Sequence, residues 1–220
     1  MATKRLTAEE LKIEQQKTLS APRMRYGFLA SLLFVGMDLF YGRRRSLSKF
    51  KVLEIIARVP YQAWESVAYI AITHMYPHKD FARRVFERVA ESRHAQDNEQ
   101  WHLLILEDLT HQRDIRESFF WYRLLPQFVA FFYYHVSWLL YVVKPSLSYQ
   151  LNAWFEDHAE HEYMQFVAED PDMESQPFES VFEEDYGSFA SLADLFRQIG
   201  YDERVHKEES LARMEAPRFE

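Results

Sequence analysis

The sequence contains no cysteine among its 220 residues. That absence excludes disulfide bonds, thiol catalysis, iron–sulfur clusters and cysteine-based zinc sites. Any metal bound by the protein must therefore be held by aspartate, glutamate or histidine. The chain has 34 acidic and 26 basic side chains and a formal net charge of −8. Because binding to the phosphate backbone of nucleic acid needs a cationic surface, we expect no nucleic-acid partner.

Glycine is also scarce, with five residues in the chain, and strict alternation of apolar and polar residues is rare. The long segments between helix-breaking residues instead show helical spacing of apolar residues. With 48% hydrophobic residues, the chain can bury one substantial core. We therefore predict an all-α protein with a polar N-terminal arm over residues 1–22 and a single helical-bundle domain over residues 23–220. The arm lacks the apolar stretch of a secretory signal.

Breaks in the apolar pattern divide the domain into six predicted helices. The first, over residues 28–37, is flanked by arginines and rises only about 15 Å, half of a hydrocarbon core of about 30 Å. We expect this helix to lie in a membrane surface, with a buried core helix as the alternative. The other five are predicted over residues 48–74, 80–109, 119–143, 145–168 and 191–214, with a bend at Pro60 and a loop over residues 169–188.

The segment over residues 119–143 is the best candidate to cross a membrane. It is rich in aromatic residues and has no charge between Gln127 and Val143. It also contains Pro126 and His135, and it falls slightly short of the roughly 20 residues that a clean span requires. We therefore favour a buried or half-buried helix of the bundle.

Two Glu-x-x-His pairs suggest a metal site. They are Glu99 with His102 and Glu203 with His206, and on a helix each pair shares one face. The spacing alone is a weak indication, because a chain of this composition is expected to contain about one such pair by chance.

A third copy of the spacing does occur, formed by Glu91 and His94. Glu91 lies eight residues before Glu99, about 80° away around a helix of 3.6 residues per turn, so both cannot point to one centre. We assign Glu91 and His94 to the solvated face.

Two helices with such pairs, joined by one inward glutamate from each of two other helices, form a known carboxylate-bridged dimetal site of four-helix bundles. The further glutamates are Glu54 or Glu65 on one predicted helix and Glu156 or Glu160 on another, and periodicity cannot choose within either pair. Such oxygen-rich ligands with some imidazole suit iron or manganese better than zinc or copper(I). The alternative is a solvated charge pattern with core histidines that bond within the protein.

Four segments, in this order, resemble the alternative oxidases, and the first two are especially similar to the plastid terminal oxidase branch. They are VLEIIARVPY at 52–61, DNEQWHLLILEDL at 97–109, FEDHAEHEYMQF at 155–166 and YDERVH at 201–206. The resemblance covers roughly residues 49–214. It implies a ferritin-like antiparallel four-helix bundle with a di-iron carboxylate site and an extra N-terminal interfacial helix.

By motif, the resemblance implies the identity of the residues that bind the two irons. The metal-binding glutamates would be Glu54, Glu99, Glu156 and Glu203. Glu65 and Glu160 would then be bystanders. The resemblance also implies that His102 and His206 either bind iron or hydrogen-bond the ligands, depending on redox state. Manganese is the less favoured metal.

The resemblance also implies roles for residues around the metals. Tyr163 matches the family's redox-active tyrosine, for which a buried tyrosine with a bonded hydroxyl is the alternative. Asn98 and Asp202 match residues that steady the ligands. Lys49 and Leu53 match positions near the quinol pocket. Position 49 usually carries arginine in relatives, and lysine keeps the charge but loses the planar guanidinium.

The activity implied by the resemblance is that of a quinol:oxygen oxidoreductase that pumps no protons. Two plastoquinols or ubiquinols in succession would reduce one O2 to water. The protein would bind one leaflet of a bilayer through apolar helices over residues 28–41 and 119–143, and it would form a homodimer. We expect a thylakoid or cytoplasmic membrane of a bacterium or cyanobacterium, or a plastid-type membrane. The alternatives are a di-iron hydroxylase acting on a quinone-like substrate and a non-catalytic metal-binding bundle at a membrane surface.

Overall fold

The computed structural model describes residues 4–216, and its regular structure in that range is entirely helical. The predicted all-α class is therefore confirmed. Residues 1–3 of the predicted arm and 217–220 of the predicted domain lie outside the described range. The α-helices are α1 (Ala8–Ser20), α2 (Phe28–Tyr41), α3 (Leu47–Ala57), α4 (Val59–Met75), α5 (Lys79–Gln112), α6 (Leu125–Val143), α7 (Pro145–Glu169), α8 (Glu183–Tyr186) and α9 (Leu192–Glu215). Two short turns complete them, the π-helical η1 (Phe120–Leu124) and the 3₁₀-helical η2 (Pro171–Glu174).

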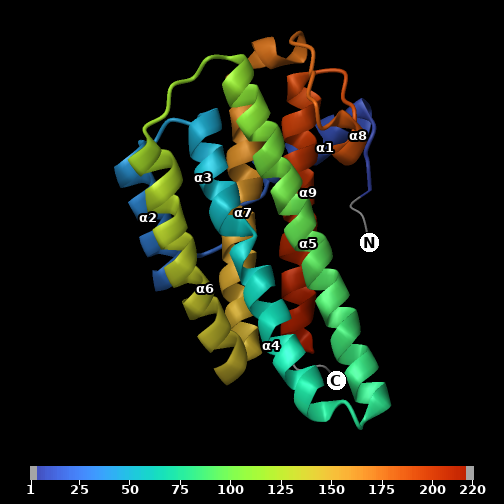
Figure 1. Cartoon of the computed structure of the whole chain (residues 1–220). Coiled ribbons are helices and arrows are strands. Elements are labelled where there is room, and N and C mark those ends of the chain that lie inside the picture. The colour runs from blue at the N-terminus through green and yellow to red at the C-terminus, as the bar shows by residue number, and fades with distance from the viewer. Residues whose placement is uncertain (1–3, 217–220) are drawn as a thin grey trace.

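Four rods form the central bundle. α3 and α4 follow one another as one rod, and α5, α7 and α9 lie beside it (Figure 1). The α3–α4 rod and α9 run in one direction, whereas α5 and α7 run in the other. The most extensive helix pair is α7 with α9, followed by α4 with α5. The chain therefore forms the predicted antiparallel four-helix bundle, and every helix that carries a candidate metal ligand belongs to it.

The α3–α4 rod is interrupted at Arg58, which separates the two helices. Pro60 has no amide hydrogen to donate, and its ring collides with the carbonyl four residues earlier in a regular helix. The predicted bend is therefore realised as a break two residues before the proline. Other boundaries also follow local chemistry. Pro145 begins α7, and the Ser191 hydroxyl accepts a hydrogen bond from the amide of Asp194 at the start of α9.

α2 and α6 lie together along one side of the bundle (Figure 1). Both present large apolar side chains to the exterior. Phe28 and Leu39 of α2 are 79% and 77% exposed, and Phe132 of α6 is 65% exposed. Within residues 4–216, no helix combines the length and apolar character needed to cross a bilayer. α6 is half-buried, because Ala130, Tyr133 and Tyr141 face inward while Phe132 lies on the exterior.

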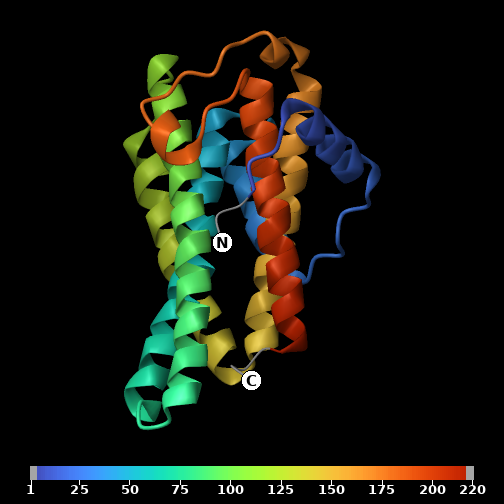
Figure 2. The same ribbon diagram turned by 90° about the vertical axis from the view of Figure 1, so that its right-hand side faces the viewer.

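Residues 8–20, inside the predicted polar arm, form α1, a helix that is not among the six predicted. α1 packs against α9 and α7 (Figure 2). Thr7 and Glu10 form a reciprocal capping box at its start, and Leu11 is buried. The predicted loop over residues 169–188 likewise contains η2 and α8. The side chain of Tyr186 at the end of α8 is 1% exposed, so this loop is anchored to the bundle.

Candidate metal centre

Four glutamates, one from each rod of the bundle, meet in its interior. They are Glu54 of α3, Glu99 of α5, Glu156 of α7 and Glu203 of α9, and each is 0% exposed. His102 and His206 follow Glu99 and Glu203 by three residues, so the helical repeat directs each imidazole to the same centre as its glutamate. Both histidines are also buried. The structure therefore brings together all six residues predicted to surround the metals.

The ligand atoms fall into two overlapping groups of four residues. Within each group, one ligand atom from every residue lies within 4.8 Å of the others. One group is Glu54, Glu99, His102 and Glu203, and the other is Glu99, Glu156, Glu203 and His206. Glu99 and Glu203 belong to both groups. Two shared carboxylates, with one further carboxylate and one imidazole on each side, form the ligand arrangement of a carboxylate-bridged dimetal site.

The hydrogen bonding of these residues tests whether metal ions fit between them. Buried atoms without a hydrogen-bond partner occur on all six residues, including both carboxylate oxygens of Glu99 and of Glu203. His206 Nδ1 lies 2.6 Å from Glu99 Oε1, and His102 Nδ1 lies 3.2 Å from Glu203 Oε1, but neither contact has hydrogen-bond geometry. A buried polar atom left unpaired costs about 1–3 kcal/mol, and more when it is charged. Cations between the oxygens would supply the missing partners, so the donor set fits a pair of metal ions.

Burial and neighbouring charges shift the pKa values of the glutamates and of His206 when no metal is bound. Burial raises the pKa of Glu54 to about 8 and the pKa of Glu156 to about 7, and it raises the pKa of Glu203 well above its ordinary value. Burial acts in the same direction on Glu99, but the neighbouring His206 and His102 outweigh it, and the pKa of Glu99 is lowered. Burial disfavours a charged His206, yet Glu99 reverses this effect and raises the pKa of His206 to about 9. Without metal, the cluster therefore holds protons in place of cations.

Asp202 connects the centre to its surroundings. Its Oδ2 lies 3.3 Å from His102 Nε2 and accepts hydrogen bonds from the Asn98 amide at 3.2 Å and the Tyr186 hydroxyl at 2.8 Å. Its Oδ1 accepts from the Gln198 amide at 2.7 Å. Asn98 and Asp202 thus lie beside the centre, where the resemblance put them. This network orients the His102 ring with Nδ1 facing the glutamates. Sequence reasoning missed Tyr186, which lies outside the periodic segments.

Two tyrosines donate hydrogen bonds to glutamates of the centre. The hydroxyl of Tyr163, predicted from the resemblance, donates to Glu54, and its ring stacks on Phe50 at 4.2 Å between centroids. The hydroxyl of Tyr61 donates to Glu156 Oε1 at 2.8 Å. Tyr61 was not predicted to belong to the site. Its position could have indicated this role, because it follows Glu54 by seven residues, about two helical turns along the same rod.

Lys49 and Leu53, the predicted quinol-binding residues, are both buried on α3. The Lys49 ammonium donates hydrogen bonds to Asp38 Oδ1 at 2.6 Å and to the Gly42 carbonyl at 2.9 Å, so it ties α3 to the end of α2. An apolar groove between α2 and α6 reaches α3, but there it is lined by Val52 and Ile56. Leu53 therefore adjoins a residue of this groove in the sequence, but neither Lys49 nor Leu53 lines the groove.

The remaining candidate glutamates lie outside the centre. Glu65 pairs with Arg93 at 2.8 Å, and Glu160 pairs with Arg204 at 2.9 Å. Glu91, assigned to the solvated face, has a side chain that is 45% exposed. These positions agree with the choice that the resemblance made within each ambiguous pair.

Comparison with known proteins gives the same family. A family model described as alternative oxidase matches residues 3–212. Ubiquinol oxidase 4, chloroplastic/chromoplastic, from Arabidopsis thaliana is 36% identical over 143 residues, which cover 64% of this chain and 36% of that protein. Ubiquinol oxidase 2, mitochondrial, from the same plant is 24% identical over 188 residues, 82% of this chain and 48% of that protein.

The chain thus spans between about a third and a half of the length of these curated relatives. The higher identity to the plastid protein confirms the predicted resemblance to that branch. Together, the match over nearly the whole chain and the buried carboxylate cluster show that the chain belongs to the alternative oxidase family.

Proposed function

We propose that the protein is a quinol:oxygen oxidoreductase, which oxidises plastoquinol or ubiquinol and reduces O2 to water at a di-iron centre. The observation that carries the proposal is the pair of overlapping ligand groups with unpartnered buried atoms, in a chain whose relatives are named ubiquinol oxidases. A site for storage alone does not need the apolar groove that approaches α3 from the outside. The groove favours an organic substrate.

The six residues would hold the two irons in a simple pattern. Glu99 and Glu203 would be shared between both metals, Glu54 and His102 would complete one side, and Glu156 and His206 would complete the other. When bound, the irons would supply one-electron redox chemistry and a place for O2 to bind. Manganese suits the same oxygen-rich ligands and is the second choice. Asp202 at His102 Nε2 leaves Nδ1 for the metal, which favours direct binding by His102.

Tyr163 holds a proton on its hydroxyl oxygen and directs it at Glu54. Burial and the neighbouring Glu54 raise its pKa well above the ordinary value, so the phenol keeps its proton until an electron leaves with it. We propose that Tyr163 supplies one electron and one proton together during O2 reduction. Tyr163→Phe is then expected to keep its iron but lose quinol-dependent O2 uptake. Full O2 uptake by the variant with bound iron would contradict the role.

The quinol would reach the centre from a membrane surface. The groove between α2 and α6 has a volume of about 380 Å³ and is lined almost wholly by apolar side chains, among them Leu33, Met37 and Tyr133. Exposed apolar residues of α2 and α6 flank it. We propose that this side lies in one leaflet of a thylakoid or cytoplasmic membrane and admits the quinol head group. We also propose that two copies of the chain form a homodimer through the remaining apolar helix faces.

A matched pair of substitutions tests the membrane surface. Val35 on α2 is 65% exposed, and Val181, far from α2 and α6 in sequence, is 77% exposed. Because burying a valine side chain is worth about 1.5–3 kcal/mol, Val35→Asp should weaken binding to lipid vesicles by at least about tenfold. Val181→Asp should leave binding unchanged in the same sedimentation assay. Equal binding by both variants would rule out this docking surface.

The decisive experiment is O2 consumption by purified, iron-loaded protein given a short-tailed quinol. Rapid uptake is expected from the parent, and none above background from Glu99→Ala, which removes a carboxylate shared by both ligand groups. An unaffected Glu99→Ala rate would contradict the site. With labelled O2, the label should appear in water, whereas label in the organic product would indicate a hydroxylase.

A further inference from the structure

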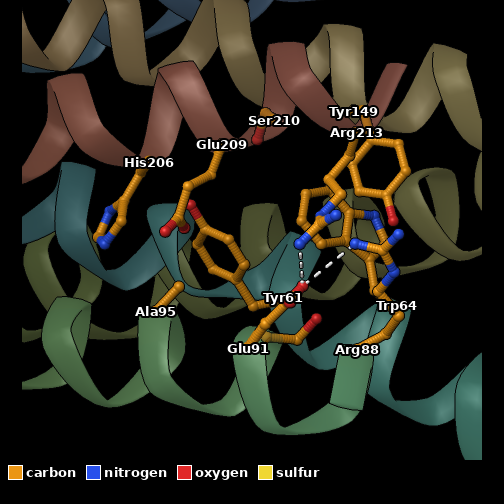
Figure 3. Close-up of a pocket in the computed structure, with 11 residues that line it drawn as sticks. Tyr61, Trp64, Arg88, Glu91, Ala95, Tyr149, His206, Glu209, Ser210 and Arg213 are labelled. Carbon is orange, nitrogen blue, oxygen red and sulfur yellow. Dashed lines mark hydrogen bonds and ion pairs between the residues drawn. The ribbon is translucent and has the colours of Figure 1, made fainter. Parts of the chain in front are cut away.

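A second opening approaches the centre between α5 and α9, with α4 and α7 beneath it (Figure 3). We call it the polar crevice. Its outer residues include Arg88, Glu91 and Arg213, and Glu91 accepts hydrogen bonds from Arg88 at 3.3 Å and from Arg213 at 2.6 Å. These side chains are partly exposed, at 16%, 45% and 34% for Arg88, Glu91 and Arg213. The pair of Glu91 with Arg213 bridges α5 and α9 at the surface, and Arg88 approaches Glu91 from one turn earlier on α5.

The inner end of the polar crevice reaches the metal centre. His206, one of the six candidate ligands, is a lining residue, and so is Tyr61, whose hydroxyl donates to Glu156. Polar groups continue between them. The Asn152 amide donates to the Tyr61 oxygen at 3.0 Å and to the Ser210 hydroxyl at 3.1 Å. Ser210 and Tyr61, which both line the crevice, are thus joined by hydrogen bonds through Asn152 to the Glu156 side of the centre.

The size and polarity of the polar crevice indicate what can pass through it. Its volume is about 40 Å³. Since a water needs about 10–15 Å³ of such space and two to four polar partners, the crevice has room for about three or four waters but not for a quinol. It opens between α5 and α9, and these helices lie on the opposite side of the bundle from α2 and α6, which form the apolar groove (Figures 1 and 2). The two openings therefore differ in both chemistry and direction.

We propose that the polar crevice is the passage by which product water leaves the centre. The inference rests on the proposed function, in which two quinols and one O2 give two quinones and two waters. Those waters form among residues that are at most 3% exposed, and the apolar groove offers them no hydrogen bonds. The polar crevice is lined by groups that can hydrogen-bond to water, among them Tyr61 and His206 at its inner end and Glu91 at its outer end. Tyr61 is the inner positioning residue of this passage.

The first test measures water in the passage without turnover. Hydroxyl-radical footprinting labels side chains that are in contact with water. Tyr61 and Tyr163 both donate to a glutamate of the centre and both are buried, but only Tyr61 lines the polar crevice. In the parent protein we expect Tyr61 to be labelled at least about threefold faster than Tyr163, because only its site has room for water. Equal labelling would overturn the proposal.

The matched variants are Ser92→Phe and Ala90→Phe. Ser92 lines the crevice, whereas Ala90 is exposed on the same helix and does not. Ser92→Phe should lower the labelling of Tyr61 to the rate of Tyr163, and Ala90→Phe should leave it unchanged. Thermal unfolding checks that both variants are folded, and Ser92→Leu with Ala90→Leu replaces them if Ser92→Phe is destabilised. Unchanged labelling of Tyr61 in the folded Ser92 variant would overturn the proposal.

The rate of turnover tests the proposed passage independently of footprinting. In iron-loaded Ser92→Phe, kcat for O2 uptake should fall by at least about threefold with kcat/KM for the quinol unchanged, because exit of product is slowed but the steps before it are not. An unchanged kcat would overturn the passage. If the parent consumes no O2 with any quinol, the proposed function fails, and the footprinting result still decides whether water occupies the passage.

Discussion

Two clusters of buried acidic residues meet at α7, and they differ in how their negative charge is compensated. Glu156 belongs to the metal centre, and its neighbour Asp157 belongs to a second group with Glu160 and His161. Both groups are buried, and both offer ligand atoms within 4.8 Å of one another. By residue type and spacing alone, the second group would also qualify as a metal site.

The second cluster is neutralised by the protein itself. The Lys207 ammonium lies 3.2 Å from Asp157 and also contacts Glu160, which the Arg204 guanidinium approaches at 2.9 Å. The Met24 amide donates to Asp157 at 2.9 Å. In the candidate metal centre, by contrast, no lysine or arginine of the described chain forms an ion pair with the four glutamates, and six of their eight carboxylate oxygens have no hydrogen-bond partner. The difference teaches that missing counter-charge, more than a set of ligating residues, distinguishes a metal centre from a structural ion-pair cluster.

The largest expected effect is the difference in iron content between two single variants, each of which removes one carboxylate from one of the two clusters. Glu203→Gln should lose bound iron and lower quinol-dependent O2 uptake by more than about 100-fold, since loss of a supporting residue alone already costs about 10–100-fold at metal sites. Glu160→Gln should keep the iron content of the parent. Metal analysis of the two purified variants measures the difference, and equal iron loss would abolish the distinction between the clusters.

Removal of the metal is the next largest effect. With free iron at about 100 times its Kd, binding stabilises the folded state by about 2.7 kcal/mol for each site, or about 5.4 kcal/mol for two irons. For a chain of this size, chelation should therefore lower Tm by roughly 10–20 °C. Glu203→Gln should not respond to the chelator. A parent Tm that does not depend on iron would indicate that the glutamates carry no metal.

The two clusters should also give stability an opposite dependence on pH when metal is absent. Burial raises the pKa of Glu54 from 4.5 to about 8, so the folded state holds more protons than the unfolded state, and stability is lost as pH rises from about 5 to 8. His206 acts in the same direction, because its stabilising charge, complete below pH 6.5, is lost as pH rises through about 9. Glu160 acts oppositely. Burial acts to raise its pKa, but Lys207 and Thr18 outweigh this and lower it, so its contribution is complete above pH 4.5 and is lost on acidification.

Thermal unfolding between pH 4 and 9 with and without iron checks these signs. The metal-free protein should lose several degrees of Tm toward alkaline pH, and iron should reduce this loss. Glu160→Gln should reduce only the loss on the acidic side. A metal-free protein that is more stable at pH 9 than at pH 6 would show that the glutamates are not protonated in the folded state.

The smallest expected effect is that of Lys207→Met. The substitution removes one of the two cations from the second cluster but leaves Arg204 in place, and the Lys207 side chain is 16% exposed. We therefore expect a loss of about 1–3 kcal/mol in the free energy of unfolding. Denaturant titration measures this loss, and the iron content should stay at the parent value. Loss of iron by this variant would link the two clusters.

Helix positions could be predicted from the sequence because apolar periodicity and prolines are local signals. The choice between Glu156 and Glu160 could not be made in this way, since the two residues lie one turn apart on nearly the same face. What separates them is Arg204, Lys207 and Thr18, which approach Glu160 from other helices. Such contacts depend on the tertiary structure. Only the resemblance to a family resolved the ambiguity.

The helix α1 and the residue Tyr186 were missed for different reasons. α1 had a local signal, the Thr7–Glu10 capping box, but the segment is polar and was predicted only as an arm. Tyr186 had no such signal. It lies in an acidic, irregular segment and is positioned by its hydrogen bond to Asp202. Residues held by one long-range contact leave no period in the sequence from which they could be found.

Gln198 gives the start of the chain an influence on the centre. This buried amide accepts a hydrogen bond from the backbone of Leu6 at 3.1 Å, and it donates to the carbonyl of Lys4 at 3.3 Å and to Asp202 at 2.7 Å. Only two side chains therefore separate the first described residues from the imidazole of His102. A tag, a cut or a deletion ahead of α1 would act on the orientation of that ring, so iron affinity would report such a change before helix content did.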